Sequence, residues 1–177
     1  MTSQHDQPGA EPDLDRDGFF RRMISDLAET LQDVVGERDA RGFISIIGAK
    51  MGDRLDRLYR HHLEKDVLSR PDVANALVDL KTRIGGDFHV VEQDDEKVVL
   101  KNSKCPFGAA VEGKPALCMM TSNVFGRIAA ENLGYARVEI EESIALGHAG
   151  CSVVVSLKQS DGKTGNGIEY FGRERSE

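Results

Sequence analysis

Three cysteines are the residues of this sequence best suited to chemistry, and all of them lie in its last two-fifths. Cys105 and Cys118 bracket the segment CPFGAAVEGKPALC, and Cys151 follows a short run of glycine and alanine. Each stands where a strand or helix is expected to meet a loop. Thiolates are soft ligands that suit zinc ions and iron–sulfur clusters. Convergence of three element ends therefore predicts one metal or cluster site formed by Cys105, Cys118 and Cys151.

The spacing of these cysteines limits the kind of metal site. The sequence has no C-x-x-C pair, which excludes a zinc ribbon or finger. Three cysteines leave one coordination position open, and His148, three residues before Cys151, is the nearest side chain in sequence that could fill it. A small molecule or solvent could equally take that position. The alternative reading of the three cysteines is that they are small buried apolar residues of the core.

Composition narrows the classes of partner. The net charge of −7 over 177 residues argues against a sequence-independent grip on nucleic acid and against an anionic membrane surface. No apolar run approaches the ~20 residues that a transmembrane helix needs, and the N-terminus has no hydrophobic signal-peptide core. These features predict a cytoplasmic protein, in which an odd set of cysteines is free or metal-bound rather than disulfide-bonded.

Motifs for catalysis are absent from the sequence. There is no G-x-S-x-G, H-E-x-x-H, Walker loop or G-x-G-x-x-G, and no nucleophile stands beside a base. His61 and His62 are adjacent on a predicted helix, so their rings point about 100° apart and are unsuited to sharing one metal. We interpret both histidines as surface residues and expect a non-enzymatic protein.

The elements that must position the cysteines follow from hydrophobic periodicity and from capping residues. Apolar residues at helical spacing predict four helices, and alternating residues predict four short strands. The expected helices are 17–35, 40–65, 70–84 and 115–133, and the expected strands are 87–91, 97–101, 137–141 and 152–157.

The order of these elements predicts an α+β fold, with N-terminal helices packed on a small antiparallel sheet. Residues 1–16 are polar and acidic and are expected to be disordered. Residues 17–158 form the single domain, and residues 159–177 are expected to be a flexible tail because they are polar and rich in glycine.

The first two helices also predict a homodimer. Both carry long apolar stripes ahead of a modest sheet. Gly42, Gly48 and Gly52 lie inside the second helix, where each costs ~1 kcal/mol relative to alanine. We expect them to allow close approach of another helix, either within the chain or across a dimer.

Residues 23–157 resemble the methanogen output domain family, a relative of the four-vinyl-reductase superfamily. The segments that carry the resemblance are GFISIIGAKMGDRL, CPFG, PALCMMTSNVFGRIAAENLGYARVE and GHAGCSVVV. The resemblance implies a helix-rich α+β sensor domain that binds small molecules and dimerises through its N-terminal helices. The segment around Cys105 and Cys118 is its most specific part.

The cysteine pattern is also similar to the C-terminal domain of the iron–sulfur-sensing repressors of cluster-assembly operons. Twelve residues separate Cys105 from Cys118, and Cys151 precedes a terminal apolar strand. The present chain lacks a winged-helix domain before the cysteines, and its first helix is acidic. The similarity therefore implies a sensing site and no repressor function.

These observations favour a cytoplasmic sensory or regulatory domain that binds an iron–sulfur cluster through Cys105, Cys118 and Cys151 and signals to a partner protein. Zinc is the alternative metal. Two other functions remain open: a module for a small hydrophobic ligand with a structural zinc, and an enzyme or accessory protein of tetrapyrrole metabolism, as the name of the superfamily suggests.

Overall fold

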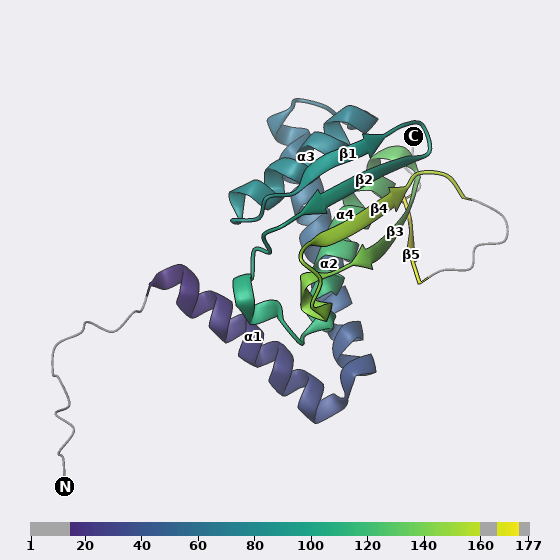
Figure 1. Ribbon diagram of the computed structural model, residues 1–177. Helices are drawn as coiled ribbons and strands as arrows, with labels where there is room; N and C mark the ends of the chain where they lie inside the picture. The colour runs from purple at the N-terminus through teal and green to yellow at the C-terminus, as the bar shows by residue number, and fades with distance from the viewer. Residues whose placement is uncertain (1–14, 160–165, 174–177) are drawn as a thin grey trace, which may run out of the picture.

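A computed structural model describes residues 15–159 and 166–173. Figure 1 shows helices gathered on one face of an antiparallel sheet. The helices are α1 (Arg16–Val35), α2 (Glu37–His62), α3 (Arg70–Arg83) and α4 (Cys118–Leu133). The strands are β1 (His89–Gln93), β2 (Lys97–Asn102), β3 (Tyr135–Glu142), β4 (Cys151–Ser156) and β5 (Ile168–Phe171). The predicted α+β class is confirmed.

The sheet has the order β1-β2-β4-β3-β5, and every neighbouring pair is antiparallel. β4 lies at the centre, as its run of three valines predicts. Because Cys151 begins β4, this cysteine is held at the end of the central strand. Cα pairing places it opposite Asn102, the last residue of β2.

β5 corrects the expectation of a flexible tail over 159–177. Residues 168–171 pair with β3, and the Tyr170 side chain is buried over α4. A Cβ atom on Gly126 would meet the Tyr170 ring at 2.1 Å, so only glycine leaves room for this contact. Residues 160–165 and 174–177 of the expected tail lie outside the described residues, as do residues 1–14 of the segment expected to be disordered.

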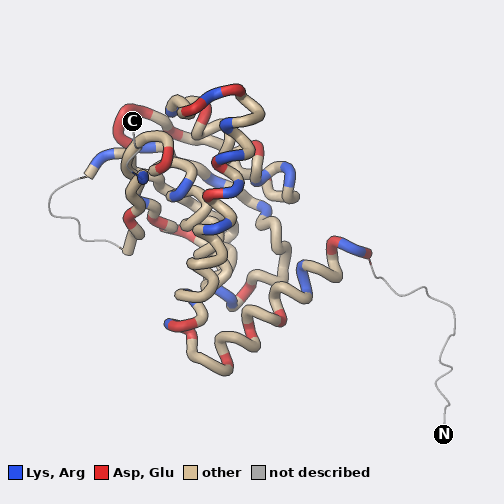
Figure 2. Tube along the Cα trace, turned by 180° about the vertical axis from the view of Figure 1, so that it is seen from behind, with Lys and Arg blue, Asp and Glu red and all other residues tan. Residues whose placement is uncertain are grey.

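The main hydrophobic core lies between the sheet and the two helices α3 and α4. Phe125 and Ile128 of α4 are fully buried, as is Leu77 of α3. α2 packs on α4, while α1 extends beyond this stack (Figure 1). Acidic and basic positions are interspersed along the elements and do not gather into a basic stripe over the described residues (Figure 2).

Two of the three predicted glycines of α2 face α4. A Cβ on Gly48 would meet Asn123 Cβ at 2.8 Å, and one on Gly52 would meet Arg127 Cβ at 2.7 Å. Gly42 has open space around it. The close helix crossing is therefore within the chain, and Gly48 and Gly52 give no support to the expected dimer.

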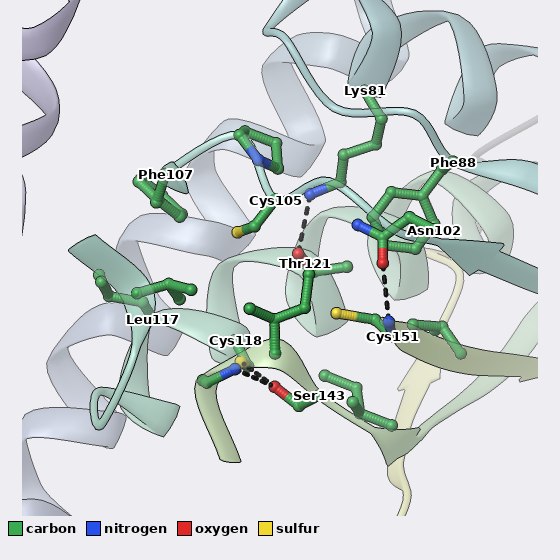
Figure 3. Close-up of a pocket in the computed structure, with 16 residues that line it drawn as sticks. Lys81, Phe88, Asn102, Cys105, Phe107, Leu117, Cys118, Thr121, Ser143 and Cys151 are labelled. Carbon is green, nitrogen blue, oxygen red and sulfur yellow. Dashed lines mark hydrogen bonds between the residues drawn. The ribbon is translucent and has the colours of Figure 1, made fainter. Parts of the chain in front are cut away.

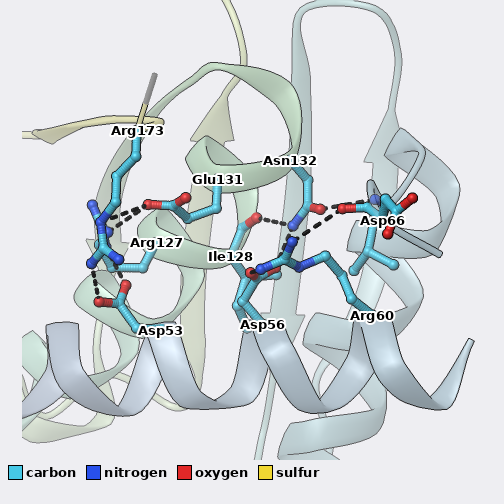
Figure 4. Close-up of polar contacts among 10 residues, drawn as sticks. Asp53, Asp56, Arg60, Asp66, Arg127, Ile128, Glu131, Asn132 and Arg173 are labelled. Atoms are coloured by element: carbon cyan, nitrogen blue, oxygen red, sulfur yellow. Dashed lines mark hydrogen bonds and ion pairs between the residues drawn. The ribbon is translucent and has the colours of Figure 1, made fainter. Parts of the chain in front are cut away.

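Polar side chains reinforce the same helix pair (Figure 4). Asp56 is 1% exposed; it accepts a hydrogen bond from Asn132 Nδ2 and pairs with Arg60. Asn132 Oδ1 in turn accepts the backbone N–H of Leu68, which anchors the loop between α2 and α3. The buried carboxylate is thus compensated by a cation and an amide, as burial of a charge requires.

α3 begins at the expected residue 70, whereas α2 begins three residues earlier than expected and α4 three residues later. Ser69 and Asp72 form a capping box ahead of α3, and Pro71 is in its first turn, as expected. α1 begins at Arg16, one residue before the expected start, and is capped by Asp15, whose carboxylate accepts the N–H of Gly18 at 2.8 Å. His61 and His62 are exposed, as predicted.

Candidate functional site: a cavity lined by three cysteines

The three cysteines line one cavity of about 30 Å³. Cys105 comes from the loop after β2, Cys118 begins α4, and Cys151 begins β4. Figure 3 shows their sulfur atoms directed into the same space from three sides. Cys105, Cys118 and Cys151 therefore line a common cavity, and their service as one metal site stays a prediction.

The loop that holds Cys105 is fixed by backbone hydrogen bonds. The carbonyl of Cys105 accepts the N–H of Gly108 at 2.9 Å, which closes the CPFG turn, and Gly108 has φ +60°. Ser103 and Lys104 directly precede this cysteine, and both donate their backbone N–H groups to the Asp87 carboxylate. A carboxylate that binds successive N–H groups pins the loop to the segment ahead of β1.

Cys151 is positioned by Asn102. The Asn102 side chain is buried; its Oδ1 accepts the Cys151 N–H at 2.8 Å and its Nδ2 donates to the Lys104 carbonyl at 2.9 Å. Gly150 permits this approach, since a Cβ there would lie 2.2 Å from the Asn102 carbonyl oxygen. One amide therefore joins the strand that carries Cys151 to the loop that carries Cys105.

Cys118 is in contact with Ser143. Its sulfur lies 3.1 Å from Ser143 Oγ, which also accepts the N–H of Ala145 and so caps the short helical turn after β3. Ser143 is 3% exposed. The first residue of α4 is thus tied to the end of β3.

All three thiols favour their protonated form. Burial raises the pKa of Cys105, Cys118 and Cys151 above the ordinary value of a thiol, because desolvation disfavours the thiolate. The Lys81 ammonium acts in the opposite direction on each of them. Metal binding would replace these protons, since thiolates and not thiols are the ligands.

Lys81 is the residue that sequence reasoning missed. It comes from α3 and is 6% exposed, and Figure 3 shows its ammonium directed into the cavity beside Thr121. The sequence held one indication, because Ala74, Leu77 and Lys81 follow the spacing of the buried face of α3. A lysine at such a position is normally read as surface, since lysine is rarely buried without a partner.

His148 does not lie in the cavity. Its side chain is exposed, and its Nδ1 lies 3.1 Å from the carbonyl oxygen of Ser143. This position does not support the expected role of His148 as the fourth metal ligand. Within residues 15–159 and 166–173, moreover, no three histidine, cysteine, aspartate or glutamate side chains are arranged as a ready metal site.

The donor set nonetheless suits a soft metal. Three sulfurs from separate elements line one cavity, and no carboxylate is among the lining residues. A volume of about 30 Å³ exceeds the ~10–15 Å³ that one water molecule needs. A cavity of this volume is nearer in size to a single ion than to a cluster of several iron and sulfur atoms.

A second, larger cavity adjoins the first. Its volume is about 250 Å³, and it lies between the starts of α2 and α4 and strands β3 and β5. Cys118, Ile140 and Ser143 line both cavities. The Cys118–Ser143 contact is therefore part of the wall between them.

None of the helices in the described ranges has both the length and the hydrophobicity of a membrane span. A search of curated proteins found no match to the chain. Among solved structures, the fold is similar to the phenol-responsive sensory domain of the transcription activator PoxR, crystallised with phenol. That comparison has a TM-score of 0.62 and 13% identity, and it covers 77% of this chain and 73% of the other.

A second similar structure is the trafficking protein particle complex subunit 3 from Naegleria fowleri, covalently bound to palmitic acid. It has a TM-score of 0.56 and 15% identity over 88% of this chain and 99% of that one. At such identities both comparisons establish the fold alone. The family model of methanogen output domain 1 matches residues 23–156, which include Cys105, Cys118 and Cys151. The chain belongs to the methanogen output domain 1 family, as the sequence predicts.

Proposed function

We propose that this chain is a cytoplasmic, non-enzymatic sensory domain whose sensing site is the three-cysteine cavity. The family match to an output domain and the fold shared with a phenol-responsive sensory domain support a signalling role. The observation that carries the proposal is the meeting of Cys105, Cys118 and Cys151, from three separate elements, in one cavity. A partner protein receives the signal.

The ligand of this cavity, in the proposal, is a soft metal bound by the three thiolates. Cys105, Cys118 and Cys151 would hold it, and a small molecule or solvent would fill the remaining position. The size of the cavity favours a single ion such as zinc over an iron–sulfur cluster. Bound metal would join the CPFG turn, the start of α4 and the end of β4 at one point, and would thereby stabilise the folded state.

The test is anaerobic purification followed by metal analysis and absorption spectroscopy of the wild-type chain. We expect about one metal centre per chain; an iron–sulfur cluster would add visible absorption bands, whereas zinc adds none. Cys105→Ser, Cys118→Ser and Cys151→Ser should each lose the metal and melt at a lower temperature than the loaded protein. His148→Ala is the matched control and should retain the metal.

Metal-free wild-type protein that cannot be reconstituted, with cysteine variants that melt like it, would contradict the metal proposal. The thiols would then be apolar wall residues of the cavity. Hydrogen exchange adds a second measurement, because loss of metal should increase exchange over about residues 102–125.

The larger cavity supports a second candidate function, the binding of a small organic molecule. It is about 250 Å³ in volume and has apolar walls from Val138, Ile140 and Ile168. Because Cys118 and Ser143 line it as well, a ligand there would touch the wall of the three-cysteine cavity. Thermal shift measurements with a panel of small aromatic and aliphatic compounds test this candidate, and no shift with any compound would count against it.

A further inference from the structure

Lys81 carries a buried charge that has no carboxylate partner among the described residues. Its Nζ donates one hydrogen bond, to Thr121 Oγ1 at 2.8 Å, and it forms none of the ion pairs found in residues 15–159 and 166–173. An ammonium group has three donor positions. The neutral Thr121 hydroxyl therefore accepts one of the three possible hydrogen bonds and leaves the positive charge of Lys81 uncompensated.

Two aromatic rings complete the surroundings of this ammonium. Nζ lies 5.5 Å from the centroid of Phe88 and 5.3 Å from that of Phe125. Ring faces attract a cation, but by less than a carboxylate does, and they exclude water. Burial consequently lowers the pKa of Lys81 to about 8, and among the described residues the three cysteines act to raise it.

The groups able to become negative near Lys81 are thus Cys105, Cys118 and Cys151. A divalent ion that binds three thiols releases three protons to solvent, and the resulting centre of one ion and three thiolates has a net charge of −1. A buried negative centre is as costly as a buried cation, unless the two compensate each other.

We propose that Lys81 is the charge-compensating residue of the three-cysteine site, so that the cavity binds a thiolate-ligated metal centre of net charge −1 and discriminates against ligands that leave the site positive. This inference rests on the proposed metal function. It assigns to Lys81 a role beside the metal rather than as a ligand, since the protonated amine has no lone pair to offer. Thr121 orients the ammonium through its hydroxyl oxygen.

The test uses cobalt(II) as a spectroscopic probe of thiolate ligation and zinc in competition with a chromophoric chelator. Lys81→Met removes the charge and keeps the apolar stem. We expect it to weaken metal binding by ~10–100-fold, as loss of an outer-shell partner does, with the sulfur-to-cobalt absorption unchanged because the ligands are the same. Thr121→Val should weaken binding in the same direction. Lys97→Met is the matched control, because Lys97 pairs with Glu92 away from the cavity, and its affinity should equal that of the wild type.

Thermal melting separates this role from a purely structural one. Removal of an uncompensated buried charge should leave the metal-free protein as stable as the wild type or more stable. The increase in melting temperature on metal addition should shrink. A Lys81→Met variant that melts much lower without metal, while it binds metal as tightly as the wild type, would overturn the inference and assign Lys81 to packing.

The two proposals fail in different ways. A wild-type chain that binds neither cobalt nor zinc refutes the metal function and, with it, the role of Lys81. A wild-type chain that binds metal while Lys81→Met and Thr121→Val bind it equally well refutes the role of Lys81 alone. If Lys81→Met does not fold, Thr121→Val decides the question, because it keeps the lysine and replaces a hydroxyl by a methyl group of similar size.

Discussion

Single side chains determine where the elements that carry the site begin, and Asp72 is the best example. Its carboxylate accepts hydrogen bonds from Lys65 Nζ at 2.6 Å and from the N–H and hydroxyl of Ser69. These contacts start α3, the helix that carries Lys81. The hydrogen bond from Lys65, followed by those from Ser69, lowers the pKa of Asp72 to about 2 from 3.8.

The lowered pKa of Asp72 makes the stability of the fold depend on pH. Because the folded pKa lies below the unfolded one, the carboxylate stabilises the fold above pH ~4, and this contribution is lost as the pH falls toward 2. Asp72→Asn should therefore reduce the free energy of unfolding at pH 7, and the deficit should vanish near pH 2. Ser69→Ala, which removes a neutral cap, should cost about 1 kcal/mol. Chemical denaturation at pH 7, 4 and 2.5 measures both, and a deficit of Asp72→Asn that is constant with pH would contradict the assignment.

Residues whose role is local could be predicted from the sequence, and those whose role depends on the tertiary fold could not. The cap at Ser69 follows from its spacing to Asp72 and Pro71, and the meeting of the cysteines followed from their places at element ends. Lys81 was missed because its burial depends on the turn that brings Phe88 back over α3 and on Phe125, which is distant in sequence. His148 was assigned by sequence proximity, and the turn after β3 directs it elsewhere.

Helices and strands show the same difference between local effects and effects of the tertiary fold, and the three glycines of α2 allow a test of it. Gly48 and Gly52 lie against α4, whereas Gly42 of the same helix meets nothing within 4 Å. Gly48→Ala and Gly52→Ala should each destabilise the chain by about 1–3 kcal/mol, because the added methyl group separates the helices. Gly42→Ala should instead stabilise the isolated chain by about 0.5–1 kcal/mol through helix propensity. Urea unfolding of the three variants is the measurement, and equal effects at all three sites would refute the close crossing of α2 and α4.

Strand β5 shows why one element escaped prediction. The sequence IEYF is short and follows a polar, glycine-rich stretch, so it carries little strand signal of its own. Its stability comes from pairing with β3 and from Tyr170, whose hydroxyl lies 2.9 Å from Ser122 Oγ. Gly126 provides the space for that ring. Such a contact becomes visible only when α4 and residue 170 are placed together.

The whole molecule leaves an apolar surface on α1 and α2 uncovered. Seven large apolar side chains of α1 and five of α2 are exposed. They are Phe19, Phe20, Met23, Ile24, Leu27, Val34, Val35, Phe43, Ile46, Ile47, Met51 and Leu58. So many exposed large apolar side chains on two successive helices are typical of an interface with another chain.

We expect a second copy of the chain to cover this surface, as the long apolar stripes of the first two helices predict. Leu27→Glu and Ile46→Glu place a charge on α1 and α2 respectively and should weaken the dimer by at least ~10-fold, because a buried unpaired charge is costly. Light scattering after size-exclusion chromatography at micromolar concentration measures the mass. Val91→Glu on β1, also an exposed apolar position, is the control and should leave the mass unchanged. A monomeric wild-type chain would contradict the expectation.

Helix α1 meets the rest of the fold in an unusual place. Its two buried residues are Ser25 and Ala28, and Ser25 Oγ donates to the Ala110 carbonyl at 2.9 Å. Glu29 pairs with Lys114 at 3.0 Å. Both partners belong to the loop between Cys105 and Cys118, so α1 rests directly on the segment that joins two walls of the cavity.

α1 contacts the loop between Cys105 and Cys118 near the middle of the helix, so a movement of this loop would turn α1 about that point. The helix has 20 residues and is therefore about 30 Å long. A tilt of about 10° around this contact, which lies near the middle of the helix, would move each end by about 3 Å. A shift of the loop between Cys105 and Cys118 would therefore change the angle at which the exposed apolar side chains of α1 meet a partner.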